Sequence, residues 1–136
     1  MLELKASLTG LASFGAYLGA GVGLTGAFLL IYTLITPYKE MSLIRSGNVA
    51  AAVSLSGALF GFLIPLGSAI THSVSLPDML VWGGVALVTQ LLAYLLARIV
   101  IPGIAKDIPE GKVSVGVFLG AISLAIGMLD AACMSY

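Results

Sequence analysis

Charged residues are scarce in this chain of 136 residues. Asp, Glu, Lys and Arg make up only 9% of it, whereas they make up about 25% of an average soluble domain. Six basic residues balance six acidic ones, so the chain has no basic surface for nucleic-acid phosphates. Hydrophobic residues account for 60% of the chain. This composition excludes a soluble globular enzyme, a disordered chain and a nucleic-acid-binding protein.

Cysteine clusters and the usual catalytic motifs are also missing. The single cysteine, Cys133, cannot form a disulfide within the chain. The sequence contains no HExxH motif, no glycine-rich phosphate loop and no Ser/His/Asp arrangement. We therefore predict that the protein is not an enzyme and holds no cofactor.

Long apolar segments are abundant, and four of them reach the roughly 20 residues that a membrane-spanning helix needs. They run from about Leu8 to Thr36, Asn48 to Thr71, Met79 to Ile101 and Val113 to Met134. The first segment as a whole is longer than one bilayer width. We therefore expect the part before Ser13 to form a separate or tilted piece. The predicted fold class is an all-α membrane protein with four transmembrane helices in a single domain, residues 1–136.

The basic residues predict how the helices are oriented. Five of the six lie in or beside two connections, whereas only Lys5 lies on the opposite side. Because cytoplasmic loops are enriched in Lys and Arg, we predict that loops 37–48 and 102–112 are cytoplasmic. Both termini would then face outward. The five residues are Lys39, Arg45, Arg98, Lys106 and Lys112.

The two halves of the chain follow the same pattern. Each half has a helix ending in proline, a short charged loop, a glycine and a helix rich in small residues. Pro37 corresponds to Pro102, and Gly47 corresponds to Gly111. We predict a tandem repeat of two-helix units, about 8–71 and about 79–135, related by a pseudo-twofold axis along the membrane normal.

Small residues at helical spacing indicate how the helices pack, since lipid provides no hydrophobic drive for their association. In the third segment, for example, the small residues Ala93 and Ala97 are spaced four apart. A surplus of glycine in the first segment suggests contacts to a second copy, as in a homo-oligomer. The predicted packing residues are Gly15, Gly19, Gly23, Gly57, Gly61, Gly116 and Gly120.

Four polar or helix-breaking residues within the segments are candidates for function. Asp130 lies about one turn from the outer end of the fourth segment, where it is either a functional carboxyl or a hydrated helix end. Gln90 and Thr25 lie at mid-segment, where interhelical hydrogen bonding is favoured over substrate binding. Pro65 interrupts the second segment, where it is expected to shape packing rather than bind an ion.

The outer side offers one further arrangement. His72 and Asp78 bracket the outer loop, and Asp130 lies on the same side by topology. An imidazole and two carboxylates suit a metal or proton site, although nothing in their spacing requires one. Arg98 and Tyr94 are interpreted as anchors at the membrane interface.

Several runs of residues resemble one family. These are TPYKEMSLIRSGNVAAAVSLSGALFG, IPL, WGGVALVTQLLAY and SLAIGMLDAACM, together with Asp78. They are similar to the YjfL-like inner-membrane family, a family of unknown function. The shared polar residues are informative in an apolar background. The resemblance carries over, as pattern positions, Pro37, Glu40, Gly47, Asn48, Gly57, Gly61, Pro65, Trp82 and Gln90.

The resemblance implies a bacterial inner-membrane protein with two copies of a helix pair. It implies no activity, because the family has none assigned. Its members often carry Asn at the position of Asp130, which weakens a proton-relay role for that carboxyl. Members tend to be encoded near stress-response and polyamine-related genes.

Two functional hypotheses remain. The first is an oligomeric accessory or structural component of an envelope-stress or transport assembly, embedded in the lipid bilayer. Its membrane or cytoplasmic partner would contact the loop that holds Tyr38, Glu40, Arg45 and Asn48. The second is a small oligomeric transporter or channel with a polar route near Gln90 and Asp130.

Overall fold

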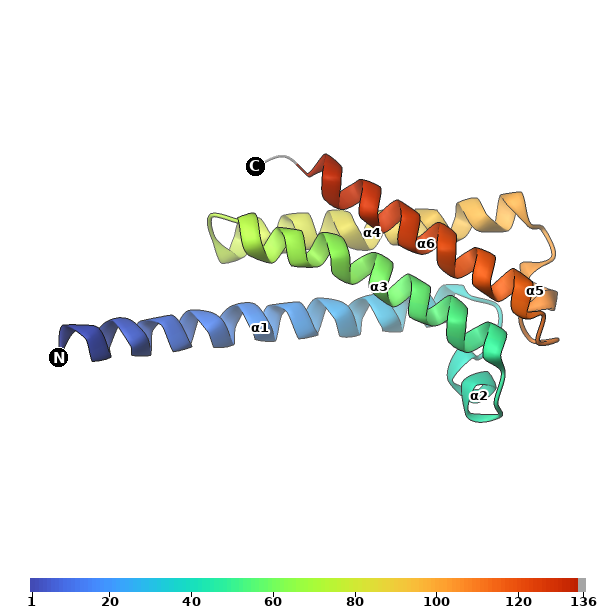
Figure 1. Ribbon diagram of the computed structural model, residues 1–136, viewed down its shortest axis with the longest axis horizontal. Helices are drawn as coiled ribbons and strands as arrows, with labels where there is room; N and C mark the ends of the chain where they lie inside the picture. The colour runs from blue at the N-terminus through green and yellow to red at the C-terminus, as the bar shows by residue number, and fades with distance from the viewer. Residues whose placement is uncertain (135–136) are drawn as a thin grey trace.

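The computed structural model describes residues 1–134, and all the regular secondary structure in that range is helical. Four long helices form an elongated bundle, and two short helices lie together at one end of it (Figure 1). We call this end the α2/α5 end. The predicted fold class of four long apolar helices is confirmed. The elements are α1 (Leu2–Ile35), α2 (Glu40–Arg45), α3 (Val49–His72), α4 (Leu76–Val100), α5 (Ile104–Asp107) and α6 (Val113–Cys133).

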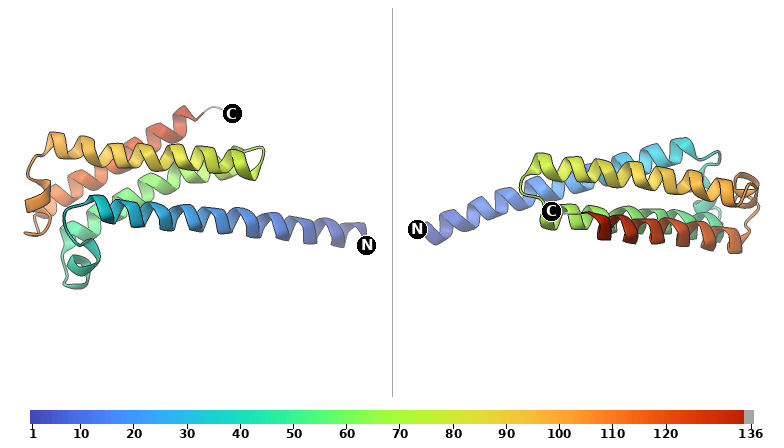
Figure 2. Two further views of the ribbon diagram at one scale, coloured as in Figure 1. Left: turned by 180° about the vertical axis from the view of Figure 1, so that it is seen from behind. Right: turned by 90° about the horizontal axis from the view of Figure 1, so that it is seen from above.

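Helix α1 is longer than predicted and has no break. Of the separate or tilted piece predicted before Ser13, the separate one is not formed, since one helix of 34 residues runs from Leu2 to Ile35. Gly10 alone is a tolerable cost within a helix, and no proline interrupts the segment. At 1.5 Å per residue α1 is about 51 Å long, well beyond the roughly 30 Å of a bilayer core. Its first part extends past the other helices (Figure 2).

Proline and asparagine define the helix boundaries that precede and follow α2. Helix α1 ends before Pro37, because proline disfavours the helical conformation at the residue before it. Thr36 is accordingly extended. Asn48 caps α3 by accepting a hydrogen bond from the Ala51 amide at 2.9 Å.

The two connections contain short helices where loops were predicted, and both end in the same backbone conformation. Gly47 has a φ of 91° and Gly111 has a φ of 79°. These left-handed conformations strain any residue with a Cβ, which explains a glycine at each position. The Gly47 amide donates to Ile44 at 3.0 Å, and the Gly111 amide donates to Ile108 at 3.0 Å. The predicted end of the second repeat, about residue 135, lies outside the described residues.

Helices α3 and α6 make the closest contact in the bundle. Glycines on both helices let the two backbones touch. A Cβ added at Gly57 would lie 2.7 Å from the Gly120 carbonyl carbon, and one at Gly116 would lie 2.7 Å from the Ala50 Cα. Gly61 and Gly127 meet in the same way, although the sequence reasoning did not identify Gly127. Helix α4 packs across this pair.

Helix α1 packs through large side chains, which corrects the prediction that Gly15, Gly19 and Gly23 pack within the bundle. A Cβ added at any of these three glycines would meet no atom within 4 Å. They lie on the side of α1 roughly opposite to Gly21, which does face the bundle. The buried side of α1 instead carries Phe28 and Tyr32. Phe28 stacks on Phe62 of α3, with ring centroids 4.6 Å apart.

Candidate functional site

The structure gathers polar side chains inside the bundle near the α2/α5 end. The group comprises a carboxyl, a threonine hydroxyl and three tyrosine hydroxyls, contributed by α1, α2, α4 and the link between α1 and α2. We call it the Glu40 cluster. Its members are Tyr32, Thr36, Tyr38, Glu40 and Tyr94, and each side chain is buried.

Glu40 is the main correction to the sequence prediction. It was expected to be a charged handle on a partner-facing loop, but only 1% of its surface is exposed. Pro37 turns the chain after α1, and Glu40 then begins α2 with its side chain inside. The Thr36 hydroxyl donates a hydrogen bond to one carboxyl oxygen, Oε1. The other oxygen, Oε2, is buried and makes no hydrogen bond with the described residues.

The electrostatics of Glu40 follow from this burial. Loss of water raises the pKa of the Glu40 carboxyl to about 7, while the Thr36 hydrogen bond opposes the rise. Burial also raises the pKa of the Tyr38 hydroxyl above its ordinary range, and the nearby Tyr94 and Glu40 add to that effect. Tyr38 therefore remains neutral, and Glu40 is the group whose pKa lies near neutral pH.

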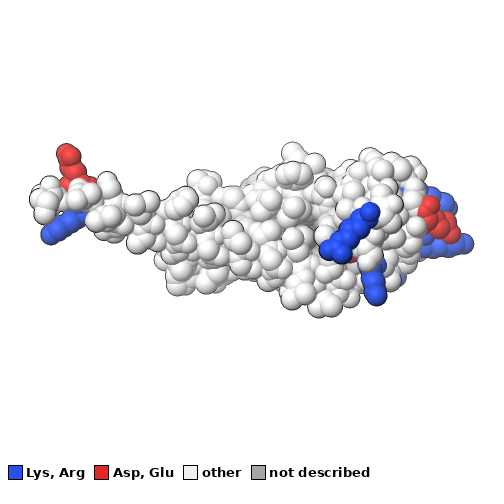
Figure 3. All heavy atoms as spheres, turned by 90° about the horizontal axis from the view of Figure 1, so that it is seen from below, with Lys and Arg blue, Asp and Glu red and all other residues white. Residues whose placement is uncertain are grey.

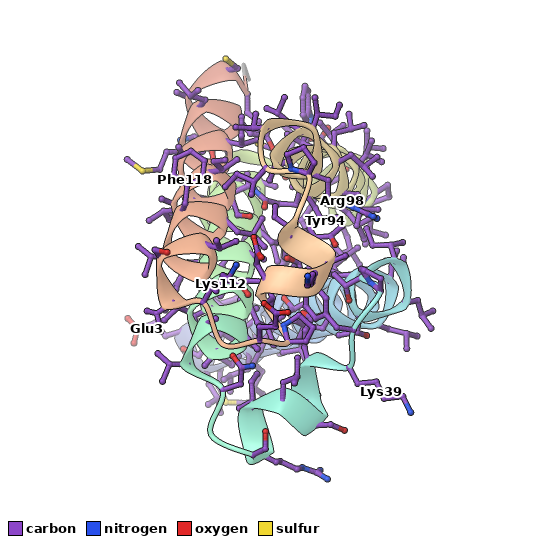
Figure 4. All side chains as sticks on the ribbon, turned by 90° about the vertical axis from the view of Figure 1, so that its right-hand side faces the viewer. Glu3, Lys39, Tyr94, Arg98, Lys112 and Phe118 are labelled. Carbon is purple, nitrogen blue, oxygen red and sulfur yellow. The ribbon has the colours of Figure 1, made fainter. Side chains whose placement is uncertain are left out.

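Aromatic contacts hold the cluster in place. Tyr32 meets Tyr94 edge to face, with ring centroids 5.5 Å apart. The Arg98 guanidinium carbon lies 6.0 Å from the Tyr94 ring centroid, at the edge of cation–π range. Viewed from the α2/α5 end, Tyr94 and Arg98 lie beside each other, whereas Lys39 points away from the bundle (Figure 4). Tyr94 is 0% exposed, so it is not the interfacial anchor that was expected.

The rest of the predicted partner loop is divided between surface and interior. Tyr38 is 7% exposed and belongs to the cluster, whereas Arg45 is exposed. Asn48 is half-buried, and its amide nitrogen donates to the Ile108 carbonyl at 2.9 Å. Asn48 thus joins the start of α3 to the end of the α5 connection.

Gln90 ties three helices together. From α4, its Nε2 donates to Gly61 of α3 and to Ser123 of α6, both at 2.9 Å. Its Oε1 is buried without a hydrogen-bond partner among the described residues. Thr25, by contrast, donates to Gly21 within its own helix at 2.8 Å. Pro65 is buried within α3, which continues through it.

We expect Gln90→Leu to lower the unfolding free energy by about 1–2 kcal/mol, since two hydrogen bonds between helices are lost. Thr89→Val is the matched control, because Thr89 bonds only to Val85 in its own helix. Thermal unfolding in detergent compares the two variants. Equal stability of both variants would contradict a tying role for Gln90.

Two of the three residues of the predicted outer metal site make local contacts instead. His72 Nδ1 lies 3.0 Å from the Ser68 carbonyl, and Asp78 accepts a hydrogen bond from the Val74 amide at 3.1 Å. Asp130 is half-buried, and its Oδ2 has no hydrogen-bond partner within residues 1–134. Over those residues no three His, Cys, Asp or Glu side chains are close enough to share a metal ion. The arrangement predicted from topology is therefore not formed.

Sequence reasoning missed Thr36 and the three tyrosines as members of one cluster. A lone tyrosine near a helix end has the composition of an interfacial anchor, so nothing local distinguishes a buried one. The available signal was Glu40 itself, a pattern position of the resembling family. A carboxyl retained in a chain so poor in charge calls for a structural or chemical reason.

Four apolar helices of spanning length, with polar groups gathered at one end, define the class: this is a multi-pass, all-helical integral membrane protein. A family model described as Domain of Unknown Function (DUF350) matches residues 6–134. The chain belongs to that family, as its resemblance to YjfL-like proteins predicted.

The names of two relatives place those proteins in a membrane and state no activity. The chain is 43% identical over 129 residues to the inner membrane protein YjfL of Escherichia coli K12, covering 95% of this chain and 98% of that protein. It is 28% identical to the transmembrane protein YshE of Bacillus subtilis 168, covering 90% of this chain and 92% of that protein. No solved structure is significantly similar to it.

Proposed function

We propose that the protein is a non-enzymatic subunit of an oligomeric inner-membrane assembly, and that copies meet through the free side of α1. One observation carries the proposal. Every residue from 1 to 16 is exposed, although these residues continue a helix that is apolar enough to span a membrane. The bundle therefore leaves much of its longest helix without a protein neighbour.

The side chains of the free side favour another helix over lipid. Gly15, Gly19 and Gly23 recur every four residues and form a smooth strip that meets no atom of its own chain. Such strips let helix backbones approach closely in a bilayer, where van der Waals packing drives association. A groove of about 500 Å³ beside the strip, between α1 and α3, is lined by apolar residues such as Leu18, Leu29 and Ile70.

The proposed orientation places the α2/α5 end in the cytoplasm. On the face shown in Figure 3, Lys and Arg gather at this end together with acidic side chains, and the long middle of that face carries no charged side chain. The positive-inside rule supports cytoplasmic connections and outward termini. The matching glycine conformations of the two connections support a tandem repeat, with α3 and α6 as equivalent helices in contact.

An accessory role would use the outer surface of α2 for a partner. Lys39 and Arg45 remain exposed there, with Met41 between them. This smaller surface replaces the loop predicted from the sequence, since Tyr38 and Glu40 are buried. The alternative of a transporter needs a polar route near Gln90 and Asp130. It is less well supported, because Gln90 holds helices together and the 500 Å³ groove is apolar.

Cysteine cross-linking in native membranes tests the oligomer. In a Cys133→Ser background, we expect Gly19→Cys to give an oxidised dimer on a denaturing gel. Adding Gly23→Leu should reduce the dimer several-fold, because a large side chain separates the strips.

Leu129→Cys is the matched control. Leu129 is 62% exposed on α6 and lies at a similar distance from the α2/α5 end of its helix, but it is on a different helix from the proposed interface. Equal cross-linking at positions 19 and 129 would reflect random collision and would contradict the proposed interface.

A further inference from the structure

The Glu40 cluster contains more buried oxygen atoms than it has hydrogen-bond partners. Glu40 Oε2 and the hydroxyls of Tyr32, Tyr38 and Tyr94 are all buried without a hydrogen bond of normal geometry from residues 1–134, although the Tyr38 and Tyr94 hydroxyls interact with each other. Buried polar groups are normally paired, so a group of four in one place is unusual. Such exceptions often mark a site with a chemical role.

The cluster also lacks a cation for Glu40. The ion pairs at this end of the bundle join Lys106 and Lys112 to acidic residues of the α5 connection, Asp107 and Glu110. Arg98 faces the ring of Tyr94 and makes no ion pair with Glu40 within the described chain. An ionised Glu40 would thus be a buried, uncompensated charge, which is strongly unfavourable.

We propose that Glu40 is a proton-binding site at the junction of α1, α2 and α4, and that loss of its proton to water releases α2 from the bundle. The chemistry is a simple dissociation, in which the carboxyl O–H bond breaks and the proton passes to water. The carboxylate left behind regains hydration only if α2 moves outward. This inference goes beyond the proposed oligomer and is independent of it.

A proton fits the site better than a metal ion does. The cluster carries a single carboxyl, so one positive charge neutralises it, and the tyrosine hydroxyls are neutral. Its members are packed against one another with negligible exposure, and a proton needs no extra space. The pKa of about 7 that burial gives Glu40 places the exchange near neutral pH.

Other titratable groups near Glu40 do not compete for this role. Tyr32 faces it from α1, Tyr38 from the link, and Tyr94 with Arg98 from α4. Tyrosine and arginine have ordinary pKa values of about 10 or higher, far from neutral pH. Helix α3 has no titratable residue before its last, His72, and the charged residues of α5 are Lys106 and Asp107.

The sign of the pH dependence follows from linkage. Because folding raises the pKa of Glu40 from its ordinary 4.5 to about 7, the folded state binds the proton more tightly. Its stabilising contribution is complete below about pH 4.5 and is lost as the pH rises through about 7. The unfolding temperature of the full chain in detergent should fall by roughly 10 °C across this range.

Two variants and one control test the assignment. Glu40→Gln, a neutral mimic of the protonated form, should abolish the fall of the unfolding temperature with pH. Glu110→Gln, which changes an exposed carboxylate, should leave that fall unchanged. Thr36→Val removes the hydrogen bond that favours the ionised form, so it should move the midpoint upward by about one pH unit. If Glu40→Gln does not fold, the Thr36→Val shift alone decides.

A spin label at Ser42 of α2, in a Cys133→Ser, Ser42→Cys chain, reports on release of the helix. Its mobility should rise with pH, and Glu40→Gln should remove that rise. The proposal would be overturned if, in a chain with an unchanged Glu40 cluster, neither the unfolding temperature nor the mobility of the spin label depended on pH. Stabilisation by sodium over choline at fixed alkaline pH, lost in Glu40→Gln, would also overturn it by identifying an alkali cation as the occupant.

Discussion

Gly61→Ala is expected to lower the unfolding free energy by about 3 kcal/mol or more, because the added methyl group would overlap the backbone of α6. The added Cβ would lie 2.7 Å from the carbonyl carbon of Ser123 and 2.9 Å from the amide nitrogen of Gln90. The first contact is with backbone, which cannot rotate away. Helices α3 and α6 would have to separate, and the Gln90 hydrogen bonds that cross this point would lengthen.

Gly67→Ala is the matched control on the same helix. A Cβ at Gly67 meets no atom within 4 Å, so only the higher helix propensity of alanine remains, and the variant should be neutral or slightly more stable. Thermal unfolding in detergent compares the two variants at one pH. A Gly61→Ala protein as stable as Gly67→Ala would mean that the close contact between α3 and α6 is wrong.

Phe28→Ala is expected to lower the unfolding free energy by about 2–4 kcal/mol and to loosen α1 from the rest of the molecule. Phe28 is 0% exposed and stacks on Phe62 at an angle of 11°. In lipid the loss comes from packing contacts and the cavity left behind, because the hydrophobic drive is small there. Much of α1 has no other contact, so this side chain carries an unusual share of its attachment.

Phe14→Ala, also on α1, removes the same ring where 63% of the residue is exposed. It should change the unfolding temperature little. Limited proteolysis of the link around Tyr38 provides a second readout, since a loosened α1 exposes that link. Equal proteolysis rates for the two alanine variants would argue against the Phe28–Phe62 stack as the main attachment of α1.

The features predicted most accurately from the sequence depend on local chemistry. Long apolar runs predict spanning helices because a bilayer requires every backbone polar group to be bonded within its own helix. Pro37 predicts the end of α1, and Asn48 predicts the start of α3, because each acts on the backbone beside it. These inferences need no knowledge of what the helices touch.

The predicted packing glycines lie at a helix contact in α3 and α6 but not in α1. A helix can carry small residues on several faces, and only its neighbours decide which face packs against another helix. Gly57, Gly61, Gly116 and Gly120 lie where α3 and α6 meet. The strip of α1 that begins at Gly15 has the same spacing, yet it faces away from the bundle. The difference comes from Phe28 and Tyr32, whose rings occupy the buried side of α1.

The polar residues show the same division. By itself, the sequence determined the class of protein, the number of long helices and the family, since these follow from composition, local backbone chemistry and shared residues. Only the tertiary structure decided that Glu40 lies inside, because its burial requires Thr36, Tyr32 and Tyr94 to converge from α1 and α4. A charge in a short loop is solvated in isolation, and its chemistry changes only when distant helices exclude water from it.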